Sequence, residues 1–316
     1  MQHYDVIGDV HGCADDLVAL LVAMGYTNDT GVFRHRSNQA IFVGDLIDRG
    51  SQQLEVLQIV KGMVDAESAR IVMGNHEFNA ICYSIPTEDG GHLRPHSDNN
   101  YDQHKKFLAQ VSDEQEHQHY LDWFRTLPLW LDLGGVRVIH ACWHEPSMKI
   151  VEQHLGSNIF SATAQFVNAS TTGHELYETV ETLLKGPELP LAEYGLPPYR
   201  DKDGATRQNA RARWWSSSDS LRDVLEISGT FTTADGAPYP LPPDVPAENL
   251  QQWYDGQVPV IYGHYWRQGE PEMGHDWTER TACVDFSAVK GGQLTAYRWQ
   301  GEGTITPDHY FRCKDA

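Results

Sequence analysis

The hydrophobic positions of this chain are grouped into short runs, and each run stops close to a polar residue. The runs cover residues 4–7, 40–43, 70–73, 136–139 and 258–262. The polar residues that follow them are Asp9, Asp45, Asn75, His140 and His264. Runs of four or five mostly apolar residues, rich in Val and Ile, are typical of buried strands. The pattern therefore predicts a sheet whose strand ends carry side chains able to bind metal ions.

The segments between the first of these runs have the spacing of amphipathic helices. Leu17, Leu20, Leu21 and Met24 stand at positions i, i+3, i+4 and i+7, and residues 56–63 repeat this spacing. Strands that alternate with helices predict an α/β fold, with a sheet covered by helices on both faces. In such sheets ligands collect beyond the carboxyl ends of the strands, where these polar residues are expected to lie.

The segment from about residue 155 to residue 255 differs in amino-acid composition from the rest of the chain. Its distinctive stretches are Pro-rich at 186–198 and 238–246 and Arg-rich at 207–215. We interpret it as an elaboration, or cap, inserted between the strand that ends at His140 and the strand before His264. Residues 1–316 are then expected to form one domain.

Composition and charge narrow the classes of function. The chain has 24 Lys and Arg against 44 Asp and Glu, a formal charge of −20 that repels nucleic acid. Two bound divalent cations would give a local positive charge suited to a phosphorylated small molecule or phosphoprotein.

No apolar run approaches the ~20 residues that span a bilayer, and no basic leader precedes the first strand, so we expect a cytoplasmic protein. The five cysteines form no Cys-x-x-Cys pair, which argues against a disulfide framework.

One set of residues has the chemistry of ligands for two divalent cations. Its members are Asp9, His11, Asp45, Asn75, His140 and His264. Carboxylates and neutral imidazoles suit such ions. Asp9 and His11 on one turn can reach the first ion, Asp45 can bridge, and the remaining three can complete the second. The expected chemistry is attack on phosphorus by a hydroxide that bridges the two ions. Any one of these residues could instead cap a helix or form a turn, but five strand ends would not all acquire such a residue by accident.

Further residues stand at positions suited to substrate chemistry. Arg49 can hold a phosphoryl oxygen through its planar guanidinium and stabilise the charge of the transition state. His76 can protonate the leaving oxygen, while Asp48 orients its ring and keeps it cationic. Arg213 could form a second phosphate clamp, although the arginines of residues 207–213 are also explained as a solvated charged face beside two core tryptophans.

Three segments resemble the signature motifs of the phosphoprotein phosphatase family of calcineurin-like metallophosphoesterases. They are GDVHG at residues 8–12, GDLIDRG at residues 44–50 and GNHE at residues 74–77. Residues 283–296 also resemble the closing strands of bacterial members, including the diadenosine tetraphosphatases. The resemblance covers about residues 3–150 and 257–300. It implies a β-sandwich of mixed sheets flanked by helices, two metal ions (Mn²⁺ first, with Fe, Zn or Mg as alternatives) and the ligand roles given above.

The chain departs from the family's usual pattern at several positions. After His140 bacterial relatives usually carry Ala-Gly and eukaryotic ones Gly-Gly, but residues 141–144 are Ala-Cys-Trp-His here and place bulk beside the metals. Asp-Phe-Ser at 285–287 replaces the more usual Asp-Thr-Gly, and Ser51 replaces a common Pro. These changes leave the size of the substrate open. The Asp48-Arg49 pair favours the phosphoprotein-phosphatase branch, since the symmetrical diadenosine tetraphosphatases usually lack that Asp.

The leading interpretation is hydrolysis of phosphomonoesters, with phosphoserine and phosphothreonine in proteins as candidate substrates. The alternative is cleavage of a dinucleoside polyphosphate such as diadenosine tetraphosphate, because the same two metals would serve both reactions. The groups that discriminate between them lie in loops that the sequence does not place. A third interpretation is a binding scaffold that has kept the fold without catalysis, against which the ligand set together with His76 and Arg49 argues.

Overall fold

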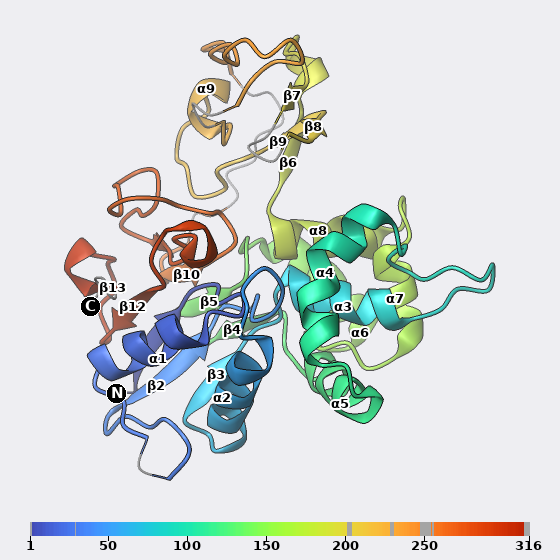
Figure 1. The fold of residues 1–316 in the computed structure, drawn as a ribbon. Helices are drawn as coiled ribbons and strands as arrows, with labels where there is room; N and C mark the ends of the chain where they lie inside the picture. Colours follow the sequence, from blue (N-terminus) through green and yellow to red (C-terminus); the bar gives the residue numbers. More distant parts are fainter. Residues whose placement is uncertain are drawn as a thin grey trace.

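Two β-sheets form the centre of the molecule (Figure 1). The computed structural model describes residues 2–28, 30–200, 204–227, 231–246, 254 and 256–312. One sheet has the order β13-β12-β1-β2-β3 and comprises β1 (His3–Ile7), β2 (Asn38–Phe42), β3 (Ala69–Ile71), β12 (Thr295–Trp299) and β13 (Tyr310–Arg312). The other has the order β11-β10-β5-β4 and comprises β4 (Trp130–Asp132), β5 (Arg137–Ile139), β10 (Val260–Tyr262) and β11 (Thr281–Cys283). Both sheets mix parallel and antiparallel pairs, which confirms the mixed sandwich implied by the family resemblance.

Alternate residues of the central strands face opposite sides of each sheet. Val6, Ile41, Val138 and Ile261 come from both sheets and form one apolar cluster between them. Their neighbours, such as Ile7, belong to a larger cluster on the helical side. The helix-covered sheet predicted from the alternation therefore has helices on one face only, because its other face is covered by the second sheet. A continuous apolar run shows that both faces of a strand are buried but not what buries them.

Helices pack on the outward faces of the sheets through the larger cluster. They are α1 (Ala14–Ala23), α2 (Gln53–Asp65), α3 (Asn75–Ser84), α4 (Asp98–Gln110), α5 (Glu114–Arg125), α6 (Glu145–Leu155), α7 (Thr163–Ser170) and α8 (Glu175–Lys185). The first two confirm the helices predicted from apolar spacing. Within the described ranges, none of the helices combines the length and the apolar character that crossing a membrane requires.

Part of the predicted elaboration leaves the sandwich as a small lobe, which we define as the described residues of 188–246. Its elements are β6 (Glu188–Pro190), β7 (Tyr199–Arg200), β8 (Thr206–Arg207), β9 (Asn209–Arg211) and α9 (Leu221–Val224). The lobe has an apolar cluster of its own and stands above the sandwich in Figure 1. By contrast, α6, α7 and α8 contribute to the main core. The extent of the elaboration, about residues 155–255, stays a prediction, and part of it lies outside the described residues.

Two tryptophans anchor the lobe to the second sheet. Trp214 Nε1 donates a hydrogen bond to the carbonyl of Ala141 at 2.9 Å. The rings of Trp214 and Trp215 lie 4.8 and 5.3 Å from the ring of Tyr262 on β10. Both tryptophans are buried, so they are core residues.

A partly buried ionic network forms a second anchor. Glu226 of the lobe accepts hydrogen bonds from Arg213 Nε at 2.8 Å and from Arg267 Nη1 at 2.7 Å. Burial acts to raise the pKa of Glu226, but the charge of Arg267, the hydrogen bond from His275 and the charge of Arg213 hold it well below its ordinary value. An ionised Glu226 thus ties the lobe to the loop that follows His264.

We expect Glu226→Gln to lower the free energy of unfolding by about 1–3 kcal/mol at pH 7, because the buried Arg267 loses a charged partner. The folded-state pKa of Glu226 is depressed, so its contribution is present above the unfolded value of about 4.3 and is lost as the pH falls. The urea midpoints of the variant and the unaltered chain should therefore differ more at pH 7 than at about pH 3, and they should coincide only below the folded-state pKa. Glu193→Gln, an exposed position on the same lobe, is the matched control. An equal loss at both pH values would show that the shape of the side chain, and not its charge, anchors the lobe.

Candidate metal centre

The six predicted ligands meet at the carboxyl ends of strands from both sheets. Asp9 and His11 follow β1, Asp45 follows β2, Asn75 begins α3 after β3, His140 follows β5, and His264 follows β10. All six are buried, with 8% exposure or less. Parallel strands bring their carboxyl ends to the same edge of a sheet. As a result Asp9 contacts His264 although 255 positions separate them in the sequence.

Two groups of ligand atoms form within this cluster, and Asp45 belongs to both. His11, Asp45 and His76 make one group, and Asp45, His140 and His264 make the other, with the atoms of each group within 4.8 Å of one another. Asp45 Oδ2 lies 3.6 Å from His11 Nε2, while Asp45 Oδ1 lies 3.5 Å from His140 Nε2. Each carboxylate oxygen faces one group, which is the arrangement expected of a ligand that bridges two cations.

Hydrogen bonds to two imidazoles show where their lone pairs point. His11 Nδ1 lies 2.8 Å from the carbonyl oxygen of Ile47, and His140 Nδ1 lies 2.8 Å from that of Val43. A carbonyl can only accept, so each Nδ1 carries the proton and each Nε2 directs a lone pair into the cluster. His11 Nε2 is buried and has no hydrogen-bond partner in the described part of the chain. It is therefore an acceptor that a cation would satisfy.

Several polar atoms crowd around His140 Nε2, and two of them, the oxygens of Asn75 and Asp45, are acceptors. Asn75 Oδ1 lies 3.1 Å from it, His264 Nδ1 3.2 Å and Asp45 Oδ1 3.5 Å. Lone pairs that face one another in a buried site repel unless a positive charge lies among them. Ligands about 2.1 Å from an ion, at tetrahedral or octahedral angles, are about 3.0–3.4 Å from one another. These separations are close to those of the cluster, so the residues fit a divalent cation.

Burial favours the neutral, metal-binding form of the histidines. It lowers the pKa of His11 to about 3, with a further contribution from the neighbouring His76. Burial also lowers the pKa of His140, and it lowers that of His264 well below its ordinary value with help from the charge of Arg211.

Asp9 stands beside the second group. Its carboxylate accepts the backbone N–H of His264, with the two oxygens 3.2 and 3.3 Å away. Burial, together with the charges of Asp285 and Asp45, raises the pKa of Asp9 well above its ordinary value. Three buried carboxylates thus influence one another here, and a positive charge would stabilise their ionised forms. The assignment of Asp9 and His11 to one ion stays a prediction.

The loops that carry the ligands are held together by Glu77 and by glycine. The Glu77 carboxylate accepts the backbone N–H groups of Asp45 at 2.9 Å, Leu46 at 2.8 Å and Gly74 at 3.0 Å. A Cβ atom on Gly44, whose φ is +96°, would lie 2.4 Å from the nitrogen of Gly74. The loops after β2 and β3 can approach this closely only because residue 44 has no side chain.

Strained backbone conformations mark the same loops. Positive φ angles occur at His11 (45°), Asp45 (51°), Asp48 (71°), Arg49 (64°), His264 (73°) and Trp266 (52°). Such angles are costly for residues with a side chain and persist only where the surrounding contacts impose them. Their concentration in these loops indicates that the surrounding contacts hold the site in a backbone conformation that is locally unfavourable.

A second set of buried side chains surrounds Asp48. His76 Nδ1 lies 2.5 Å from Asp48 Oδ2, and His104 Nδ1 lies 2.9 Å from Asp48 Oδ1. Burial acts to raise the pKa of Asp48, but hydrogen bonds from His104 and His76 hold it well below its ordinary value. Burial acts to lower the pKa of His76, but Asp45 and Asp48 raise it above its ordinary value. Asp48 and His76 therefore lie in contact, as the motif spacing suggested, while the catalytic roles assigned to them stay a prediction.

Arg49 lies across Trp266 at the edge of the site. Its Cζ is 4.2 Å from the centroid of the Trp266 ring, and that ring is 6.1 Å from the ring of His11. Lys106 Nζ donates to the carbonyl of Arg49 at 2.5 Å. An indole ring holds the guanidinium plane in place through a cation–π contact. This contact restrains Arg49 beside the metal groups.

Other contacts of the site were not predicted from the sequence. The residues are Glu77, His104, Arg211, Trp266 and Asp285, the last of which accepts the backbone N–H of Trp266 at 2.8 Å. Glu77 is the last residue of the third motif, so the sequence could have identified it as part of the site. His104, Arg211 and Trp266 lie outside the three motifs, and only tertiary packing brings them to the site. Arg213, the predicted second clamp, forms an ion pair with Glu226.

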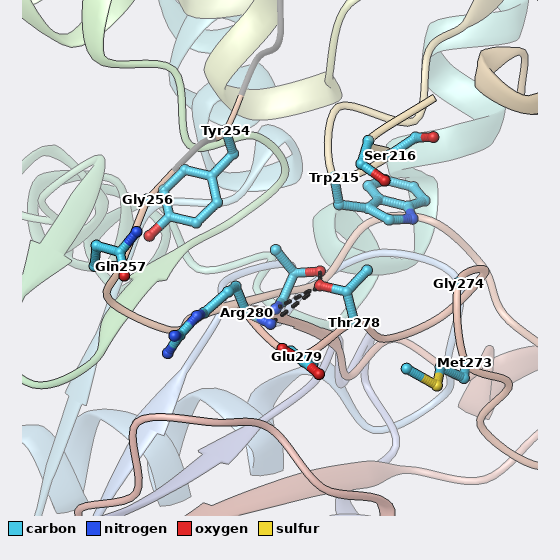
Figure 2. A pocket seen from close by; sticks show the side chains of 12 residues that line it. Trp215, Ser216, Tyr254, Gly256, Gln257, Met273, Gly274, Thr278, Glu279 and Arg280 are labelled. Carbon is cyan, nitrogen blue, oxygen red and sulfur yellow. Dashed lines mark hydrogen bonds between the residues drawn. The ribbon is translucent and has the colours of Figure 1, made fainter. Parts of the chain in front are cut away.

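A separate cavity of about 520 Å³ lies beside Trp215 and Tyr254 (Figure 2). Its lining includes Gln257, just before β10, and Arg280, just before β11. The cavity therefore lies at the amino ends of these strands, whereas His264 follows the carboxyl end of β10. It is distinct from the metal groups.

Buried His and Asp groups at the strand ends of a mixed sandwich are consistent with a binuclear metal site of a hydrolase. Residues 3–268 match the family described as calcineurin-like phosphoesterase, and the chain belongs to this family. The resemblance inferred from the motifs and the expectation of a phosphoesterase are thus confirmed.

Relatives with assigned activities fall into two types. The symmetrical bis(5'-nucleosyl)-tetraphosphatase of Psychromonas ingrahamii is 25% identical over 93% of this chain and 92% of its own length. That of Klebsiella pneumoniae is 28% identical over 95% of this chain and 93% of its own length. The asymmetrical bis(5'-nucleosyl)-tetraphosphatase PrpE of Oceanobacillus iheyensis is 30% identical, but over 43% of this chain, and the match spans only 54% of that relative.

We expect Glu77→Gln to weaken the binding of divalent metal by about 10- to 100-fold, because the amide loses one of the two acceptors that hold the loops after β2 and β3. Calorimetric titration of the metal-free protein with Mn²⁺ measures the change. Glu55→Gln, an exposed position on α2, is the control. Unchanged affinity in the Glu77 variant would mean that the loops keep their spacing without this carboxylate.

Proposed function

We propose that this phosphoesterase cleaves a phosphoanhydride bond in a dinucleoside polyphosphate such as diadenosine tetraphosphate. The similarity of nearly the whole chain to symmetrical bis(5'-nucleosyl)-tetraphosphatases carries the proposal. Similarity limited to the three motifs would support only the shared metal chemistry. The leading interpretation from the sequence, hydrolysis of phosphomonoesters, is thus less well supported than its alternative.

The proposal assigns two divalent ions to the cluster, with Mn²⁺ as the first choice. Asp9 and His11 would bind one ion, Asp45 would bridge, and Asn75, His140 and His264 would complete the second. The lone pairs of His11 and His140 and the double placement of Asp45 support the roles given to these three residues. Asp9 lies against His264, so its place in the first ion's shell rests on the motif alone. When bound, such ions would acidify a water molecule and withdraw charge from the phosphoryl group.

The chain's own residues would orient the substrate and supply a proton. Arg49, restrained by Trp266, would hold the phosphoryl oxygens and stabilise the charge that develops on them. His76 Nε2 lies 3.9 Å from Asp45 Oδ2, so it faces the metal groups while Nδ1 is bound to Asp48. The cationic His76 would donate its Nε2 proton to the leaving oxygen.

A polyphosphate extends past the metal groups and needs further positive charge. Arg211, at the end of β9 in the lobe, has its Cζ 5.8 Å from the ring of Tyr265, the residue after His264. After burial, its charge has the largest influence on the pKa of His264, and Lys185 acts in the same direction. Because Arg213 is engaged by Glu226, the remote phosphate clamp is assigned to Arg211 in its place.

One observation favours hydrolysis of phosphomonoesters as the second candidate. The buried pairing of His76 with Asp48 is suited to a leaving group that needs a proton, such as the alkoxide of serine or threonine. A nucleoside phosphate departs with less need of an acid. The same pairing argues against a scaffold without catalysis.

Removal of metal is expected to abolish hydrolysis, because the nucleophile depends on the ions. Mn²⁺ should restore activity to the chelated protein, whereas Ca²⁺, which acidifies water poorly, should not. Activity is measured after dialysis against a chelator, and metal content by elemental analysis of the reactivated protein. Fewer than about one divalent ion per active chain would contradict the two-metal assignment.

A substrate panel tests the choice between the two candidate functions. It compares kcat/KM for diadenosine tetraphosphate, a phosphoserine peptide, a phosphotyrosine peptide and nucleoside monophosphates at one Mn²⁺ concentration. We expect the tetraphosphate to exceed the peptides by more than about tenfold, with two nucleoside diphosphates as products. Peptides that match or exceed the tetraphosphate would restore the phosphomonoester assignment.

Within the same panel, Arg211→Ala should raise KM for the tetraphosphate by about tenfold or more and leave a monoester within about twofold, because only the longer substrate reaches a remote clamp. Arg213→Ala is the matched control, since this arginine is held by Glu226. A larger effect from Arg213 than from Arg211 would reverse the assignment.

A further inference from the structure

The carboxylate of Asp48 divides its two oxygens between two imidazoles. Oδ2 lies 2.5 Å from His76 Nδ1, and Oδ1 lies 2.9 Å from His104 Nδ1. The three side chains are buried, with exposures of 3% for Asp48, 5% for His76 and 4% for His104. The first contact was expected from the motif, whereas the second comes from a helix outside it.

The donors and acceptors of this triad are determined by its chemistry. An ionised carboxylate can only accept, so each histidine donates from Nδ1. For His76 this leaves Nε2 directed at the metal groups, where it lies 3.9 Å from Asp45 Oδ2. For His104 it leaves Nε2 in the interior, without a hydrogen-bond partner among the described residues. His104 therefore contributes one polar contact to the site, and that contact is to Asp48.

The ring of His104 is held by its surroundings. It lies 5.0 Å from the ring of Phe107, the other buried residue of α4, and 5.1 Å from the ring of Tyr83 at the end of α3. Aromatic packing on two sides fixes the direction in which Nδ1 points. Asp48 therefore receives a donor whose position does not depend on the motif loop.

Helix α4 also contacts the backbone of the same loop. Lys106 Nζ donates to the carbonyl of Arg49 at 2.5 Å, and Gln110 Nε2 donates to that of Ser51 at 2.6 Å. Together with His104, these contacts place one face of α4 against residues 48–51. The helix thus braces the loop that carries both Asp48 and Arg49.

A second hydrogen bond changes what Asp48 can do. The terminal torsion of an aspartate is broad, so a carboxylate held through one oxygen can rotate and change the direction in which its partner is held. A donor on each oxygen fixes the plane of the carboxylate. The ring of His76 is then held in one orientation, with Nε2 toward the place where a leaving group departs.

We propose that His104 is a positioning residue that orients His76 through Asp48. The role rests on the proposed function of His76 as a general acid. It extends the pair expected from the motif to a triad whose third member comes from α4.

The test replaces His104 by Phe, which keeps an aromatic ring beside Tyr83 and Phe107 but removes the donor, and by Asn, which keeps a donor at the δ position. We expect His104→Phe to lower kcat by about 10- to 100-fold on glycerol phosphate, whose leaving group needs a proton. The loss on 4-nitrophenyl phosphate should stay within about twofold. His104→Asn should recover most of the activity, and bound metal should not change. Equal losses on both substrates, or no recovery with Asn, would overturn the proposal.

A double variant tests whether His104 acts through His76. Because both changes remove the same proton donation, His76→Asn combined with His104→Phe should be no slower on glycerol phosphate than His76→Asn alone. His117→Phe is the matched control, since the ring of His117 lies 5.3 Å from that of Phe107 on the neighbouring helix. It should leave both substrates unaffected. Additive losses in the double variant would show that His104 acts by another route.

A spectroscopic measurement separates this proposal from the assigned function. In protein labelled with ¹⁵N-histidine, the Nδ1 protons of His76 and His104 should give two resonances far downfield, and His104→Phe should remove one and shift the other. A His76 resonance that does not move would overturn the positioning role. If the resonance moves but His76→Asn shows no dependence on the leaving group, the positioning role stands and the acid role of His76 fails.

Discussion

Lone pairs that face one another around Asp45 and His140 impose the main constraint on this structure. Asn75 and Asp45 each direct an oxygen acceptor at His140 Nε2 from 3.5 Å or less, and His264 Nδ1 lies 3.2 Å from the same atom. Without a cation such a cluster opposes folding, so metal binding and folding are expected to be coupled. The surrounding loops must hold these side chains in place against their mutual repulsion. Close contact at Gly44, positive φ angles at several ligands, and the bonds accepted by Glu77 serve this purpose.

The same constraint explains why elements far from the motifs contribute to the site. A strained loop keeps its shape only if rigid neighbours hold it. The loop after β2 is held by α4 through His104, Lys106 and Gln110. The loop after β10 is held by Asp285 through the backbone of Trp266. Elements outside the motifs thus add to the rigidity that Gly44 and Glu77 provide within them.

Much of this arrangement could be predicted from the sequence. The runs before Asp9, Asp45, Asn75, His140 and His264 indicated strands with ligands at their ends, and the spacing of Asp48 and His76 anticipated their pairing. The apolar runs could not show that two sheets face each other, because a buried strand has the same composition under a helix or a sheet. His104 could not be found either, because one histidine on a largely polar helix carries no periodic signal. Nothing in the sequence distinguishes Arg211 from Arg213 as a phosphate clamp, whereas the structure shows Arg213 paired with Glu226.

The attachment of the lobe has a consequence for how such enzymes diverge. Trp214 and Glu226 dock on the second sheet and on Arg267, three residues beyond the ligand His264, and none of these contacts involves the three motifs. The lobe is therefore docked through residues other than those of the three motifs. Under the proposed function, Arg211 of the lobe would hold the remote phosphate while residues of the sandwich would bind the metal ions, so selection can act on substrate range and on catalytic chemistry through separate parts of the chain. Under that proposal, changes in the lobe would alter the molecules that are recognised while the reaction is inherited.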